Sequence, residues 1–187
     1  MDRNVQFVQQ AQVERTMKAL AKNRIPSVYV PNRQEAVKAV ESLLAPGDVI
    51  SCGGSVTLAE SGVRDLMKSG AYEFLDREEL PPEEVYRRTF SADVFLTSAN
   101  AITEEGELYN VDGNGNRVAA LIFGPKRVIV VAGVNKIVPN LQAAISRVKC
   151  LAAPANGVRL EPHTPCSRLG RCSGWEGGMT AGCASER

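Results

Sequence analysis

Histidine is almost absent from this sequence, since His163 is the only one among 187 residues. A catalytic triad of the Ser-His type would therefore require this one residue, near the carboxyl end, to reach back into the fold. No stretch approaches about 18 consecutive apolar residues, so we expect no membrane-spanning helix and no membrane partner. The first residues also lack an apolar core of signal-peptide length, which favours a cytoplasmic protein.

An excess of charge of one sign is missing as well. The chain has 22 Lys and Arg against 21 Asp and Glu, which gives a net charge of +1. This balance argues against a broad nucleic-acid interface, so we expect no nucleic-acid partner. Hydrophobic residues make up 44% of the chain, as in folded globular proteins, and the length allows one domain with a real core.

The five cysteines include no CxxC pair and are odd in number, so a disulfide framework is not expected in a reducing compartment. Three of them, Cys166, Cys172 and Cys183, lie in a carboxyl-terminal segment rich in Pro, Gly and Ser. They suggest a soft metal site holding zinc or an iron–sulfur cluster. Three thiolates are one short of the usual four, so His163 or another cysteine would complete the set. A tail with free thiols is the alternative.

Helical and strand patterns alternate along most of the chain, which predicts a three-layer α/β fold with a mostly parallel sheet. We expect helices at about 4–23, 36–44, 56–67, 82–90, 117–123 and 139–148. We expect strands at 27–30, 49–52, 72–75, 94–96 and 128–132, with a hairpin around Gly106. The composition changes to loop-forming residues from Pro154 onward. We therefore divide the chain into a domain at 1–160 and a tail at 161–187 that is loop or disordered.

A glycine-rich segment, Cys52-Gly-Gly-Ser-Val-Thr57, follows the strand predicted at 49–52 and opens a helix. Two glycines allow a ligand close to the backbone, and the amides of a helix start suit a phosphate or carboxylate. This predicts an anion site formed by Gly53, Gly54, Ser55 and Thr57. The alternative is a tight turn in which Ser55 caps the helix. Glu60, in the first turns of that helix, is a candidate acid or base, although a solvent-exposed Glu is the usual case.

Polar residues also follow the strands predicted at 94–96 and 128–132. In an open α/β sheet, ligands bind beyond the carboxyl ends of the strands, so we expect these residues to line one site. Asp112-Gly-Asn-Gly-Asn-Arg117 would orient a polar ligand, or would be an Asx-rich turn that caps the next helix. Asp112 is the second candidate for proton transfer. The candidate ligand-binding residues in these segments are Asn100, Asp112, Asn114, Asn116, Arg117, Asn135 and Lys136.

Several of these motifs resemble the LUD-domain family, the lactate-utilisation domain, formerly a domain of unknown function. They are Gly53-Gly-Ser-Val-Thr-Leu-Ala-Glu-Ser-Gly62, Phe74-Leu-Asp76, Thr97-Ser-Ala-Asn-Ala-Ile102, Gly106 to Arg117, Phe123-Gly-Pro125, Gly133-Val-Asn-Lys136 and Ala152-Ala-Pro-Ala-Asn156. The resemblance covers nearly all of residues 5–173. It implies a Rossmann-like fold of the NagB/RpiA/CoA-transferase type, in which the glycine-rich loop holds phosphate or CoA-type anions.

The resemblance also implies partners and a cofactor. Larger relatives in lactate-utilisation operons take part in oxidising lactate with iron–sulfur proteins, and family members of this type usually end in a four-cysteine pattern. Cys166 and Cys172 match its first two positions, Trp175 stands at the third, and Cys183 lies about one residue from the fourth. By analogy we expect a homodimer.

Two hypotheses follow. The chain is an enzyme or enzyme subunit that binds a small anionic metabolite, namely a hydroxy acid, a sugar phosphate or a CoA ester. Alternatively, it is a non-catalytic accessory or regulatory partner of an iron–sulfur lactate-oxidising complex.

Overall fold

The computed structural model describes residues 2–160, 164–174 and 183. The chain forms two compact units, each of which is described by itself below. Unit 1 consists of Met1–Val28, Ala99–Gly115 and Val134–Arg187, and unit 2 of Tyr29–Ser98 and Asn116–Gly133.

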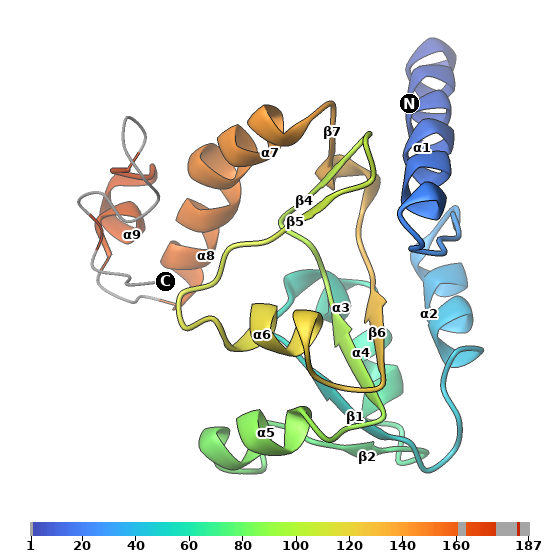
Figure 1. The fold of residues 1–187 in the computed structure, drawn as a ribbon, viewed down its shortest axis with the longest axis vertical. Helices are drawn as coiled ribbons and strands as arrows, with labels where there is room; N and C mark the ends of the chain where they lie inside the picture. The colour runs from blue at the N-terminus through green and yellow to red at the C-terminus, as the bar shows by residue number, and fades with distance from the viewer. Residues whose placement is uncertain (1, 161–163, 175–182, 184–187) are drawn as a thin grey trace. The chain divides into compact units, whose positions relative to one another are not determined.

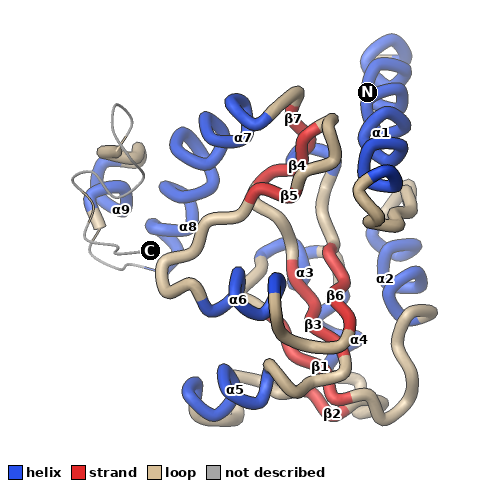
Figure 2. Tube along the Cα trace, viewed as in Figure 1, coloured by secondary structure: helices blue, strands red, loops and turns tan. Residues whose placement is uncertain are grey.

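Unit 2 contains a parallel four-stranded sheet, seen as adjacent arrows in Figure 1 and red strands in Figure 2, with the order β2-β1-β3-β6. The strands are β1 (Val49–Cys52), β2 (Glu73–Phe74), β3 (Val94–Thr97) and β6 (Arg127–Val130). In β1 and β3 every residue is at least half-buried, as expected of parallel strands covered on both faces. The predicted mostly parallel, Rossmann-like α/β architecture is confirmed.

Helices cover both faces of this sheet. Ile50, Val94 and Leu96 point to one face, where they form the main core with Val40, Leu58, Val63 and Met67 from three helices. These helices are α2 (Arg33–Glu41), α3 (Val56–Glu60) and α4 (Val63–Met67). Phe95, between Val94 and Leu96 in β3, points to the opposite face because side chains alternate along a strand. That face carries α5 (Pro82–Thr89) and α6 (Asn116–Ile122).

Unit 1 contains a smaller, mixed sheet with the order β5-β4-β7. β4 and β5 form the hairpin predicted around Gly106, and β4 also pairs in parallel with β7. Its elements are α1 (Arg3–Lys22), β4 (Ala101–Thr103), β5 (Leu108–Tyr109), η1 (Val134–Lys136), β7 (Ile137–Val138), α7 (Leu141–Arg147), the π-helical turn η2 (Val148–Ala152), α8 (Ala153–Leu160) and α9 (Pro165–Leu169). The chain passes from α7 through η2 into α8 without leaving helical conformation.

Three sequence-based expectations are wrong. Residues 27–30 form no strand, and the Val28 side chain is 75% exposed, because no neighbouring strand pairs with this short apolar run. The helix predicted at 56–67 is divided into α3 and α4 at Gly62, whose φ of +83° is left-handed. The segment after Pro154 is helical over α8, which directly continues the π-helical turn η2.

The tail predicted as loop or disordered contains the short helix α9 among its described residues. His163 and Trp175 lie outside the described residues. Within the part of the chain that the structure describes, no helix combines the length and the apolar character needed to cross a bilayer.

Gly106 provides a stability test. Its φ is +85°, and a Cβ added there would lie 2.6 Å from the backbone carbonyl carbon of Ala19 in α1. Gly70 has the same φ but nothing within 4 Å of an added Cβ. We predict that Gly70→Ala lowers the free energy of unfolding by about 1–2 kcal/mol through backbone strain. Gly106→Ala should cost about 1–3 kcal/mol more through overpacking. Urea titrations of both variants measure the difference, and equal losses would contradict this packing.

Candidate functional site

The carboxyl edge of the unit 2 sheet has a topological switch point between β1 and β3. The chain leaves β1 towards α3 and α4 on one face, whereas α6, the next helix of unit 2 after β3, lies on the other. The two connections therefore diverge from the centre of the sheet. In open α/β sheets this divergence creates the crevice in which ligands bind.

Arg117 joins the two loops at this point. It stands in the first turn of α6, and its Nη1 donates a hydrogen bond to the Ser98 carbonyl, just beyond β3, at 3.1 Å. The stem of Arg117 lies on Gly53, just beyond β1, since a Cβ at Gly53 would be 2.9 Å from Cδ and 3.0 Å from Cγ of Arg117. Gly53 is needed here for this close approach. The guanidinium is thereby held at the mouth of the crevice.

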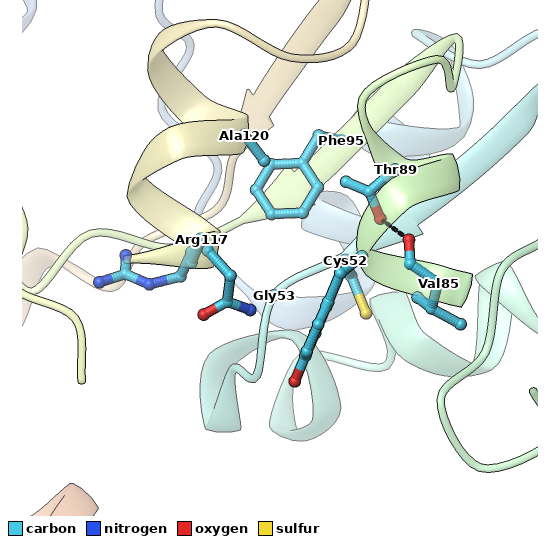
Figure 3. Close-up of a pocket in the computed structure, with 9 residues that line it drawn as sticks. Cys52, Gly53, Val85, Thr89, Phe95, Arg117 and Ala120 are labelled. Atoms are coloured by element: carbon cyan, nitrogen blue, oxygen red, sulfur yellow. Dashed lines mark hydrogen bonds between the residues drawn. The ribbon is translucent and has the colours of Figure 1, made fainter. Parts of the chain in front are cut away.

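A narrow pocket lies beside this contact (Figure 3). Its wall is formed by the Phe95 ring with Ala120 of α6 and with Val85 and Thr89 of α5, and Cys52 and Gly53 also line it. Tyr86 and Asn116 complete the lining. The cavity volume open to water-sized molecules is about 20 Å³, which is room for one water. A larger ligand would bind at the mouth, or the Arg117 stem would have to move.

Next to this pocket, the hydroxyl groups of Ser51 and Thr89 are hydrogen-bonded to each other. The Thr89 hydroxyl donates to the Val85 carbonyl at 2.7 Å and lies 2.6 Å from the Ser51 hydroxyl. Because a hydroxyl has one hydrogen to donate, Ser51 is the donor in the second contact. This chain of bonds attaches α5 to the centre of β1 and fixes that wall of the pocket.

The other predicted residues of unit 2 have simpler surroundings. Ser55 caps α3, since its Oγ accepts the Leu58 N–H at 3.3 Å. This is the alternative role that the sequence left open. Thr57 is half-buried in the first turn of α3, whereas Gly54 and Glu60 are exposed. Asn116 begins α6 next to Arg117. The structure therefore brings Gly53, Asn116 and Arg117 together at the pocket.

The remaining candidates, Asn100, Asp112, Asn114, Asn135 and Lys136, belong to unit 1. Two of them meet at Arg147, the last residue of α7, which donates to the Asn100 carbonyl at 2.6 Å and to the Asn135 carbonyl at 3.4 Å. The Asn100 side chain in turn accepts the Val111 N–H at 2.9 Å. The sequence did not single out Arg147, because a lone arginine at the end of a helix carries no signal.

Comparison with protein families matches residues 13–180 to the LUD domain. The chain belongs to the LUD domain family. The resemblance drawn from the sequence motifs is therefore confirmed. None of the curated proteins compared with the chain matches it.

Three thiols in the tail of this LUD domain, those of Cys166, Cys172 and Cys183, are the predicted metal ligands. No three Cys, His, Asp or Glu side chains among those residues are placed to hold a metal ion. Cys166 lies 3.2 Å from the Thr164 hydroxyl, and the buried Cys172 donates its backbone N–H to the Lys149 carbonyl. The described thiols thus do not fit the predicted zinc or iron–sulfur site. His163, the other suggested ligand, lies outside the described residues.

A second group of charges lies beyond β2, around Asp76. Its side chain is 4% exposed, with Lys68 Nζ 2.8 Å from Oδ2 and Arg64 Nη2 3.4 Å from Oδ1. The Glu78 N–H also donates to Oδ1 at 3.0 Å. Burial by itself raises the pKa of Asp76, but Lys68, the Glu78 amide and Arg64 outweigh burial and hold the pKa below its ordinary value of 3.8. The carboxylate therefore stabilises the loop after β2.

Sequence reasoning missed Phe95, Tyr86 and Thr89 as pocket residues. The sequence places Phe95 in a buried strand but does not indicate which face of the sheet its side chain lies on. The reason is that residues 94–97 show no alternation of apolar and polar side chains. Tyr86 and Thr89 reach the pocket only because α5 packs on β1, which no local pattern indicates.

We predict that Asp76→Asn lowers the free energy of unfolding by about 1–3 kcal/mol at neutral pH, because Arg64 and Lys68 lose a shared buried carboxylate and are left with the exposed Glu78. The folded-state pKa of Asp76 is lowered, so its contribution is present above pH 3.8 and is lost as the pH falls through the folded-state value. The difference between wild type and variant should therefore shrink in acid. Urea unfolding at about pH 7 and pH 2.5 tests this. Glu35→Gln, which breaks the exposed pair with Lys38, is the control with almost no effect.

We predict that Cys52 resists alkylation. Burial raises the pKa of its thiol to about 11, so the reactive thiolate is scarce near neutral pH. Cys150 is exposed and should react at least about tenfold faster. Peptide mass spectrometry after timed treatment with iodoacetamide at about pH 8 compares the two residues. Equal rates would show that Cys52 is open to solvent.

Proposed function

We propose that this LUD-domain chain binds a small anionic metabolite at the switch point of the unit 2 sheet, and that this binding serves lactate utilisation. The observation that carries the proposal is Arg117, which lies on Gly53 and donates to the Ser98 carbonyl. One cation thus joins the loops that leave the two central strands.

The chemistry of this edge suits an oxyanion. The N–H donors of a guanidinium lie in one plane, so the group can form two parallel hydrogen bonds with a carboxylate or phosphate. Hydroxy acids, sugar phosphates and CoA esters are the candidate ligands. Proton transfer by Glu60 in unit 2, or by Asp112 in unit 1, stays a prediction.

We predict that Arg117→Ala weakens binding of the anion about 10- to 100-fold, the loss of roughly 1.5–3 kcal/mol expected for a hydrogen bond to a charged group. Gly53→Ala should also weaken binding, because its Cβ would displace the Arg117 stem. Arg87→Ala, on the exposed face of α5, is the control that leaves affinity unchanged.

Thermal shift with L-lactate, pyruvate, a sugar phosphate and a CoA ester selects the ligand, and isothermal titration with that ligand measures each variant. If no compound raises the melting temperature of the wild type, the proposal fails. It also fails if Arg117→Ala binds as tightly as Arg87→Ala.

A second candidate is an accessory partner of an iron–sulfur lactate-oxidising complex. The observation in its favour is an adjacent apolar pair at the end of α6, where Ile122 is 74% exposed and Phe123 86% exposed. Exposed apolar patches mark interaction surfaces. Sedimentation of the chain with a purified iron–sulfur subunit tests this role. Binding that Phe123→Ser abolishes would support it, and the same runs on the chain alone test the predicted homodimer.

A further inference from the structure

Arg147 lies at the amino-terminal ends of two neighbouring parallel strands in unit 1. Its Nη1 donates to the carbonyl of Asn100, which directly precedes β4. Its Nε donates to the carbonyl of Asn135, which lies in η1 just before β7. These strands pair in parallel, with Ile102 opposite Ile137. The guanidinium is therefore hydrogen-bonded to two carbonyls, one just before each strand.

The same arginine indirectly organises a third segment. Asn100 gives its carbonyl to Arg147, while its side-chain Oδ1 accepts the Val111 N–H at 2.9 Å. Val111 leads into Asp112, and Asn135 leads into Lys136. Polar segments from three distant parts of the chain thus converge on one cation within unit 1.

Arg147 also differs from the paired arginines of the described chain. Arg15, Arg64 and Arg127 each form an ion pair with a carboxylate. The half-buried Arg147 forms no ion pair within residues 2–160, 164–174 and 183, and both of its hydrogen bonds go to neutral carbonyls. Burial lowers the pKa of this guanidinium, and no carboxylate among the described residues opposes that effect. A partly desolvated charge without a counter-charge is costly, and an oxyanion would offset that cost.

We propose that Arg147 is the binding group of an oxyanion site within unit 1, flanked by Asn135 and Lys136, which takes a carboxylate or phosphate group. The Nη2 group, which makes no hydrogen bond to the described residues, donates to the anion while Nε and Nη1 stay on the two carbonyls. This site is distinct in residues from the one proposed around Arg117, and it stands or falls independently of it.

The test is a side-chain nitrogen NMR titration of the full chain carrying Arg117→Ala, so that the other site contributes nothing. Sodium acetate and inorganic phosphate are added separately at constant ionic strength. We expect the Arg147 Nε resonance to shift and saturate with at least one of them, which also tells a carboxylate site from a phosphate site. The Arg159 resonance, from a side chain paired with Asn156 on α8, should change only linearly.

Two variants separate binding from a structural role. In the position-147 variants binding is followed through the backbone amide of Lys136, because the Nε resonance is gone. Arg147→Gln keeps amide donors for the carbonyls but loses the charge, and it should weaken saturable binding at least tenfold. Arg147→Lys keeps the charge but loses the planar guanidinium. Its affinity for the anion should lie between that of Arg147→Gln and that of the Arg117→Ala parent. The proposal is overturned if Arg147 and Arg159 shift alike. It is also overturned if the shift of the Arg147 resonance never saturates, and this measurement needs no variant at position 147. A third contradicting result is that Arg147→Gln binds the anion as tightly as its Arg117→Ala parent.

Discussion

The contact of Arg117 with Gly53 and Ser98 is the constraint on which the unit 2 site depends. It requires β1 and β3 to be adjacent and parallel, so that both loops leave the sheet at the same edge. It also requires a residue without a side chain at position 53, because a Cβ there would overlap the arginine stem. Finally, α6 must begin where its first turn reaches both loops. Given these three conditions, a long cationic side chain is held at the crevice by packing on Gly53 and by its hydrogen bond to the Ser98 carbonyl.

The surroundings of this contact make it stiff. On one side, Ser51 and Thr89 fasten α5 to β1, and the Phe95 ring lines the pocket together with residues of α5 and α6. Farther along the same edge, the buried Asp76 forms ion pairs with Arg64 of α4 and with Lys68, the residue after α4. The opposite face of the sheet is a continuous apolar core. A binding group supported in this way loses little conformational entropy when a ligand arrives.

Much of this architecture could be predicted from the sequence, and the exceptions have physical causes. Alternation of helix and strand, with glycine after β1 and proline at the start of α5, indicated the layers and the loop that meets Arg117. The run at Val28 resembled a strand, but pairing depends on neighbours that a local pattern does not contain. Arg147 could not be singled out from the sequence, because the carbonyls that it binds lie 12 and 47 residues away in the chain. The tail thiols had the composition of a metal site, but their described positions do not form one.

The central claim is that Arg117 makes the β1/β3 crevice an anion site. The most direct measurement is a crystal structure of the chain grown with the carboxylate or phosphate ester that most raises its melting temperature. The account predicts ligand density whose oxygens lie within hydrogen-bond distance of the Arg117 guanidinium, beside Gly53 and Gly54. Density for that ligand bound elsewhere, with Arg117 still donating only within the protein, would contradict it.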